Sequence, residues 1–154
     1  LSVNVVSKNT EWCIDFTGES FIKPQIEYKT EILLIQRGNE PFKDCWCLPG
    51  GFINMNETLK EAAVRELKEE TDIGIPEDYL HSVGTYDTVN RDERDRVITN
   101  AFWSFSREEP TAGDDAKEAV WFDFDMIHDN LGFDHYQILK DSYSLFCQTL
   151  NIRE

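Results

Sequence analysis

Apolar and polar residues follow one another along this chain in the patterns of a mixed α/β protein. Six short segments have the composition of strands: residues 3–6 and 12–16, which polar residues separate, and residues 31–36, 80–86, 97–105 and 119–124. The strongest is 31–36 (EILLIQ), an apolar run typical of a strand buried on both faces. Residues 87–96 are highly charged and predict a loop near a binding site.

Two segments predict amphipathic helices. Residues 58–71 contain strong helix formers, with Asn56 as the expected N-cap and Asp72 just after the helix end. Residues 134–150 place apolar side chains along one side of a second helix. Because the strands alternate with these two helices, we expect an α/β fold with a mixed sheet between helical layers.

Length and composition predict one globular domain over residues 1–154, since 40% of the 154 residues are hydrophobic. No apolar run approaches the roughly 18 residues that a membrane-spanning helix needs, and the start carries no signal-peptide pattern. We therefore expect a cytoplasmic protein with no membrane partner. The chain begins with Leu1 rather than Met, which leaves open that the domain is cut from a longer protein.

Charge and cysteine content narrow the classes of function. The formal net charge of −15 and the lack of a basic stripe argue against a nucleic-acid partner. A small anionic substrate stays compatible with this charge if metal ions neutralise the site. The four cysteines, Cys13, Cys45, Cys47 and Cys147, form no CxxC pair and predict buried, reduced thiols rather than a zinc site.

Three glutamates late in the first predicted helix point to metal chemistry. On a helical wheel, an apolar arc is formed by Leu59, Ala62, Ala63 and Leu67. We expect Glu66, Glu69 and Glu70 to project on the side of that arc. Buried carboxylates are costly unless a positive charge neutralises them, and few basic residues lie nearby in the sequence. The pattern therefore favours binding of Mg²⁺ or Mn²⁺, and the alternative is a partly solvated groove edge. Gly50 and Gly51, just before the helix, allow backbone to approach a metal or phosphate, although such a pair is often only a turn.

A longer pattern includes these residues. Gly51, five residues, Glu57, seven residues and then Arg65-Glu66-Leu67-Lys68-Glu69-Glu70-Thr71-Asp72-Ile73 resembles the Nudix box. The family usually has Gly where this chain has Asp72. Because that position follows the helix end, where a left-handed backbone is common, we expect Asp to be tolerated at a small cost in stability.

The resemblance extends over about residues 30–140 and is strongest to ADP-ribose pyrophosphatase-like Nudix domains. It is carried by residues 33–42, Trp46, residues 48–52, residues 91–99 (RDERDRVIT, with Asp95 where relatives usually have Gly), Asp114-Asp115-Ala116 before Trp121-Phe122, and Phe133-Asp134-His135-Tyr136. It implies the Nudix α/β/α sandwich with a mixed sheet. Similar domains occur alone, fused to nicotinamide mononucleotide adenylyltransferases, or as sensor domains of NAD-metabolism repressors.

The resemblance also implies a set of metal ligands. Glu66, Glu69 and Glu70, with the Gly50 carbonyl, would bind Mg²⁺ or Mn²⁺, which polarises phosphoryl oxygens and activates water. Glu57 and Arg65 would lie behind these ligands or form a helix-stabilising ion pair.

Candidate residues for catalysis and substrate binding follow from the same resemblance. The general base is Glu70 or a carboxylate of the later loop, where Asp115 fits best and Glu118 is second; for both loop residues a plain surface charge is the alternative. The substrate-binding candidates are Arg37, Arg94, Arg96 and Gly51, with solvated arginines as the alternative. Phe16, Phe21, Trp46 and Tyr86 could stack an adenine, but core packing is favoured for each, and a structural role is favoured for His135.

We therefore expect metal-dependent hydrolysis of a small nucleotide substrate, with ADP-ribose cleaved to AMP and ribose 5-phosphate as the leading reaction. The alternatives are a Nudix domain that senses ADP-ribose without cleaving it, and the Nudix half of a bifunctional enzyme of NAD metabolism. A homodimer is compatible with the resemblance, although no patch in the sequence indicates one.

Overall fold

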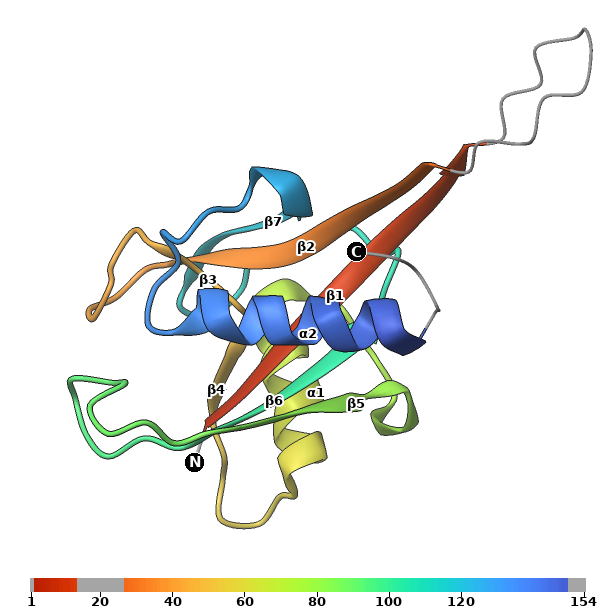
Figure 1. Ribbon diagram of the computed structural model, residues 1–154. Coiled ribbons are helices and arrows are strands. Elements are labelled where there is room, and N and C mark those ends of the chain that lie inside the picture. The colour runs from red at the N-terminus through yellow and green to blue at the C-terminus, as the bar shows by residue number, and fades with distance from the viewer. Residues whose placement is uncertain (1, 14–26, 150–154) are drawn as a thin grey trace, which may run out of the picture.

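The computed structural model describes residues 2–13 and 27–149, with side chains described from residue 30 onward. The strands are β1 (Ser2–Cys13), β2 (Glu27–Arg37), β3 (Trp46–Cys47), β4 (Gly50–Phe52), β5 (His81–Tyr86), β6 (Thr99–Phe105) and β7 (Ala116–Asp123). The α-helices are α1 (Leu59–Thr71) and α2 (His135–Thr149), and two short 3₁₀ helices are η1 (Glu77–Tyr79) and η2 (Phe124–Met126). Figure 1 shows their arrangement.

The strands form one mixed sheet. Its path runs β3-β2-β1-β6-β5, while β4 pairs with β1 and β7 pairs with β2. The β1–β6 pair is parallel, and the other pairs are antiparallel. The prediction of two separate strands near the start was wrong, because β1 is continuous from Ser2 to Cys13 and its polar stretch pairs with β2 through the backbone, from Lys8 opposite Ile32 onward. The last residues of that prediction, 14–16, lie outside the described residues.

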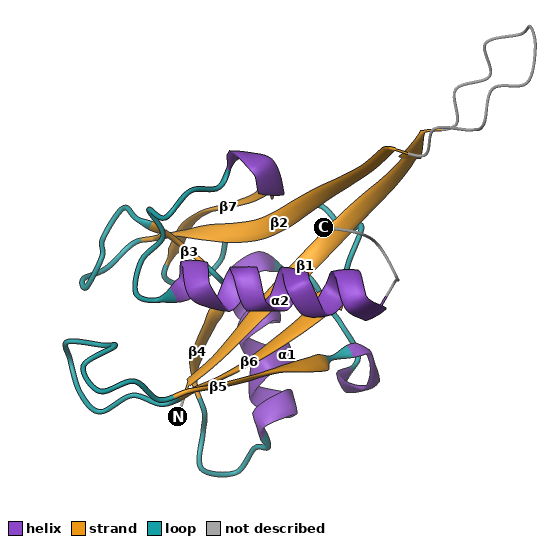
Figure 2. Ribbon diagram, in the orientation of Figure 1, coloured by secondary structure: helices purple, strands orange, loops and turns teal. Residues whose placement is uncertain are grey.

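The two faces of the sheet carry separate hydrophobic cores. Along β2, Ile32 and Leu34 pack in the cluster that contains Ile138 and Leu139 of α2, whereas Leu33 packs in the cluster of α1. This alternation follows from the two-residue period of a strand. Figure 2 shows α2 in front of the sheet and α1 behind it. The predicted α/β/α sandwich is confirmed.

The ends of α1 differ in part from the prediction. The N-cap is Thr58 rather than Asn56, because Thr58 and Glu61 form a capping box in which each side chain accepts a hydrogen bond from the other residue's backbone N–H. At the other end Asp72 has φ 60°, the expected left-handed conformation. The Lys68 ammonium holds this end by donating to the Asp72 carbonyl at 2.9 Å. The helix that carries the glutamates therefore has two well-defined ends.

Three of the four cysteines have side chains that the structure describes. Cys47 and Cys147 are buried free thiols, and Cys45 is partly exposed. The Cys13 side chain lies outside the described residues. In the described part of the chain, no helix has the length and apolar composition to cross a membrane.

Candidate active site

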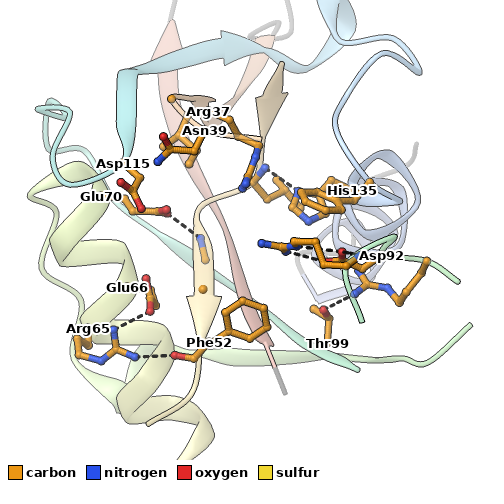
Figure 3. Close-up of a pocket in the computed structure, with 18 of the residues that line it drawn as sticks. Arg37, Asn39, Phe52, Arg65, Glu66, Glu70, Asp92, Thr99, Asp115 and His135 are labelled. Carbon is orange, nitrogen blue, oxygen red and sulfur yellow. Dashed lines mark hydrogen bonds and ion pairs between the residues drawn. The ribbon is translucent and has the colours of Figure 1, made fainter. Parts of the chain in front are cut away.

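A cleft of about 340 Å³ is lined by residues of α1 and β4, of the loops after β2 and β5, and of the start of α2. Its charged lining residues are Glu66, Glu70, Asp92, Asp115, Arg37, Arg65, Arg91 and Arg94. Its ring-bearing lining residues are Phe52, Phe133 and His135. Figure 3 shows the glutamates on one wall and His135 and Asp92 on the opposite wall. The volume lies in the range of small-molecule sites.

Glu70 is a partly buried carboxylate on the glutamate wall of the cleft. Helix α1 carries it one turn after Glu66, and the Gly50 N–H donates a hydrogen bond of 2.8 Å to its Oε2. The pKa of the Glu70 carboxyl is raised to about 8, chiefly by burial; the Gly50 N–H and Arg37 oppose this shift, and the charges of Glu66 and Asp114 add to it. A positive ion in the cleft would therefore favour its ionised form.

Glu66 lies against the backbone of β4 at Gly51. A Cβ atom at Gly51 would lie 2.4–2.5 Å from the carboxyl atoms of Glu66, so only glycine leaves room for this carboxylate. Burial raises the pKa of Glu66, which Arg65 opposes with a hydrogen bond of 2.6 Å. Glu66 and Glu70 thus line the same wall of the cleft one helical turn apart, and the charge of Glu66 raises the pKa of Glu70.

Arg65 connects the other acidic residues of the predicted site. Its guanidinium donates to both oxygens of Glu57, at 2.6 and 2.9 Å, and to the Phe52 carbonyl at 3.0 Å. The pKa of Glu57 falls to about 2, chiefly through the hydrogen bonds from Arg65. The ion pair expected between Glu57 and Arg65 is therefore present, and it joins α1 to the turn that precedes it.

Glu69 does not face inward, and this part of the prediction was wrong. Its side chain is 42% exposed, receives a hydrogen bond of 3.0 Å from Arg65, and lies outside the residues that line the cleft. At about 100° per residue, Glu69 projects about a quarter turn from the centre of the apolar arc, while Glu66 and Glu70 project close to it. The role of Glu69 as a metal ligand stays a prediction.

The loop before β7 brings Asp115 to the same wall as Glu70 (Figure 3). Backbone hydrogen bonds hold it there. The Gly113 N–H donates to the Glu70 carbonyl at 3.0 Å, and the Gly38 N–H donates to the Asp115 carbonyl at 2.8 Å. Glu118, the second base candidate, is an exposed residue of β7 outside the cleft lining.

The opposite wall carries arginines on aromatic rings. Arg94 is paired through two hydrogen bonds, of 2.6 and 3.0 Å, with the buried Asp92. Its guanidinium carbon lies 5.3 Å from the ring centre of Phe52 and 5.5 Å from that of Phe133. Arg37 lies 5.1 Å from the Phe133 ring centre. Guanidinium groups stacked on rings can bind anions through their remaining N–H groups. Here Arg94 already donates to Asp92, and Arg37 donates from Nε to the Pro41 carbonyl at 2.7 Å.

Arg96 differs from the other two candidate arginines. It is exposed, donates to the Asp87 carbonyl at 2.8 Å, and is not among the residues that line the cleft.

The comparisons with known proteins agree with this geometry. A family model described as the NUDIX domain matches residues 25–142, which is most of the chain. The chain belongs to the Nudix family. It is 47% identical over 117 residues to an ADP-ribose pyrophosphatase of Methanocaldococcus jannaschii, which corresponds to 75% of this chain and 68% of that enzyme.

Two further matches are to a transcriptional repressor and to a NUDIX domain solved with ADP ribose. The chain is 32% identical over 120 residues to an ADPR responsive transcriptional repressor of Acinetobacter baylyi, and the match covers 74% of the chain but only 47% of the repressor. The NUDIX domain of Shewanella oneidensis NrtR, solved as a complex with ADP ribose, has a TM-score of 0.77 and 25% identity, covering 94% of this chain and 86% of that domain.

The acidic wall of this Nudix domain fits a divalent metal ion, which Nudix hydrolases generally use. Glu66 and Glu70 present hard oxygen donors one turn apart, and burial raises the pKa of both carboxyls. A nearby dication would offset that cost. Among residues 30–149, no three His, Cys, Asp or Glu side chains come together as a complete metal-binding group. The Gly50 carbonyl and Glu69, which lies outside the cleft lining, stay predicted ligands.

Arg91, which lines the cleft, was not singled out from the sequence. Arg91 is 4% exposed at its side chain and donates to both Asp134, at 2.8 Å, and Thr99, at 2.7 Å. It thereby fastens the charged loop to the start of α2. In the sequence, Arg91 appeared only within residues 91–99, which carry part of the family resemblance. A run of charged residues does not show which of its side chains is buried.

His135 has a structural role, as expected. Its Nδ1 accepts a hydrogen bond of 3.1 Å from the Leu48 N–H, so Nε2 carries the hydrogen, and burial lowers the pKa of this imidazole to about 3.

The aromatic residues of the cleft are not the ones proposed for adenine stacking. Trp46 packs on Phe122 at 4.7 Å between ring centres, and the Tyr86 hydroxyl donates to Asp141 at 2.7 Å; neither lines the cleft. Phe16 and Phe21 lie outside the described residues. Phe52, which is 51% exposed, and Phe133 occupy the cleft instead.

Proposed function

We propose that the chain hydrolyses ADP-ribose to AMP and ribose 5-phosphate in the presence of Mg²⁺ or Mn²⁺. The observation that carries this proposal is the division of the cleft, which places paired carboxylates on one wall and arginines stacked on aromatic rings on the other. A diphosphate with bound metal matches the first wall, and the outer parts of a nucleotide match the second. The archaeal relative, named as an ADP-ribose pyrophosphatase, supports this substrate.

Each candidate residue has a separate task in this reaction. Glu66, Glu69, Glu70 and the Gly50 carbonyl would hold the metal, which supplies Lewis-acid polarisation of the phosphoryl oxygens and a more acidic water. Arg65 and Glu57 keep these glutamates oriented. Arg37 and Arg94 bind the diphosphate or the terminal ribose, and Gly51 leaves space for backbone contacts to the substrate. Arg96 lies beyond the cleft lining and would act only through contacts of the outer loop.

The proton of the attacking water needs an acceptor. Water adds across one P–O–P bond, the bridging oxygen leaves with one phosphate, and one proton passes to the base. Because Glu70 would be engaged as a ligand, we favour Asp115, whose carboxylate lines the same wall.

A sensor domain is the second candidate function, and the repressor relative favours it. Such a protein would bind ADP-ribose in the same cleft without turning it over. We further infer that the chain is one Nudix domain, to which other domains could be joined in the native protein. Dimerisation of that domain is also a proposal.

A substrate panel separates the two functions. We expect purified protein with Mg²⁺ or Mn²⁺ to release AMP from ADP-ribose faster than it cleaves other nucleoside diphosphate derivatives, as measured by chromatography of products. Glu70→Gln should abolish turnover, whereas the exposed control Glu77→Gln should retain it. Binding of ADP-ribose without turnover of any nucleotide would support the sensor and contradict the hydrolase.

A further inference from the structure

Two glycines hold the loop that carries Asp115, and they lie outside the glutamate helix. We propose that Gly38 and Gly113 are positioning residues that fix the Asp115 carboxylate beside Glu70 for proton transfer. This inference rests on the hydrolytic function proposed above. In this proposal, close backbone contacts at the two glycines position the carboxylate, and no further charged side chain is needed.

The first attachment of the loop is to the end of α1. The last carbonyls of a helix have no partner within the helix and need other donors. Here the Thr71 carbonyl accepts from the Thr111 N–H at 2.8 Å, and the Glu70 carbonyl accepts from the Gly113 N–H at 3.0 Å. The residue that offers a carboxylate to the cleft therefore also anchors the loop through its backbone.

Gly113 makes this attachment close. A Cβ atom at position 113 would lie 2.3 Å from the Glu69 carbonyl oxygen, which is backbone of the helix and has little freedom to move. Any larger residue would push the loop away from α1. The turn that follows is closed by the Ala116 N–H, which donates to the Gly113 carbonyl at 3.0 Å, so a displacement of Gly113 would be passed on to Asp115.

The second attachment is to the end of β2. The β2–β7 pairing shifts register between Gln36 and Arg37, and beyond the shift the Gly38 N–H donates to the Asp115 carbonyl at 2.8 Å. A Cβ atom at position 38 would lie 2.5 Å from that same oxygen. Gly38 thus contacts the residue whose carboxylate it would position.

Space, rather than backbone conformation, explains both glycines. Neither has a φ in the left-handed region, so alanine could adopt the same backbone angles. By contrast, a Cβ atom at Gly84 would meet nothing within 4 Å. Gly84→Ala is therefore a matched control for the loss of glycine itself.

The expected effect is on the rate of the chemical step. An alanine at position 38 must move the Asp115 carbonyl from 2.5 Å to beyond 3.0 Å of the new Cβ atom. Because a misplacement on the order of 1 Å can cost about 100-fold in rate, we expect kcat to fall by about 10- to 100-fold. KM should change by less than about threefold, since Arg94 and the rings of the opposite wall are not attached to this loop.

The test compares Gly38→Ala, Gly113→Ala and Gly84→Ala in steady-state turnover of ADP-ribose with Mg²⁺. We expect the first two variants to lose kcat, the control to match the wild type, and thermal melting to stay cooperative in Gly38→Ala. The double variant Gly38→Ala/Asp115→Asn should lose no more than about twofold beyond Asp115→Asn alone, because both changes act on one group.

Three results would overturn this inference: full kcat in Gly38→Ala, an Asp115→Asn variant as active as the wild type, or an undiminished Gly38→Ala effect in the Asp115→Asn background. If Gly113→Ala does not fold, Gly38→Ala alone decides, because its contact lies away from α1. An inactive wild type would instead contradict the proposed hydrolase, so the two failures can be told apart.

Discussion

Replacing Glu70 by glutamine should make the metal-free protein more stable while it destroys activity. The wild-type carboxyl has a pKa of about 8 in the folded protein against an ordinary value of 4.5, because it is buried next to other carboxylates. The folded state therefore holds a proton that the unfolded state releases between these two pH values. By linkage, wild-type stability is unaffected by this group below pH 4.5 and falls as the pH rises through 8.

The magnitude follows from the shift. At about 1.4 kcal/mol per pKa unit, ionisation of Glu70 costs the fold at most about 3 kcal/mol at pH 7 and about 5 kcal/mol at pH 9. Glutamine has nearly the same shape, stays neutral, and its carbonyl can still accept the Gly50 N–H. For a chain of this size the gain at pH 7 corresponds to a rise in Tm of at most about 6–12 °C.

The assay is thermal unfolding of wild type and Glu70→Gln in buffer with a chelator, from pH 5 to pH 9. The two melting curves should coincide near pH 5 and separate as the pH rises, with the variant above. Added Mg²⁺ should then raise the Tm of the wild type more than that of the variant. A wild-type Tm that rises with pH relative to the variant would refute the reasoning, because it would mean that Glu70 is better stabilised as an anion than in water.

Three further variants test other parts of the structure. Gly51→Ala should displace the Glu66 carboxylate and raise the Mg²⁺ concentration for half-maximal turnover by about tenfold, since lost support of a ligand typically costs 10- to 100-fold in metal affinity; an unchanged Mg²⁺ titration would contradict a ligand role for Glu66. Phe133→Ala removes a ring beneath two guanidinium groups and should raise the KM for ADP-ribose by about three- to tenfold with kcat nearly unchanged, as steady-state kinetics would show. Leu67→Ala opens a cavity at a fully buried position of α1 and should lower the free energy of unfolding by about 2–5 kcal/mol in urea titrations, whereas an effect below about 1 kcal/mol would mean that the core of α1 is loosely packed.

The sequence was sufficient where local chemistry decides the structure. The apolar run of β2 predicted a strand buried on both faces, and the alternation of Ile32, Leu33 and Leu34 between two cores confirms it. The position of Asp72 after a helix predicted a left-handed residue, which its φ of 60° confirms. In both cases a short segment determines its own conformation.

The sequence was insufficient where contacts between distant segments determine which polar side chains are buried. Asp92 lies among charged residues, and only the fold shows that it is buried and paired with Arg94. The prediction also placed Glu69 inward together with Glu66 and Glu70, and the structure shows it 42% exposed. Burial of a polar side chain depends on its tertiary partners, and a pattern of residue types does not contain them.

The two walls of the cleft come from different parts of the chain. The carboxylates lie on a capped helix, while Asp92 and Arg94 lie on the loop between β5 and β6, which Arg91 fastens to Asp134. Substitutions in the loop between β5 and β6 can therefore change substrate preference without altering the carboxylates of α1. A library that varies the exposed residues 87–90, 93, 95 and 96 but keeps Arg91, Asp92 and Arg94 would sample new substrates while the buried contacts of the loop stay in place.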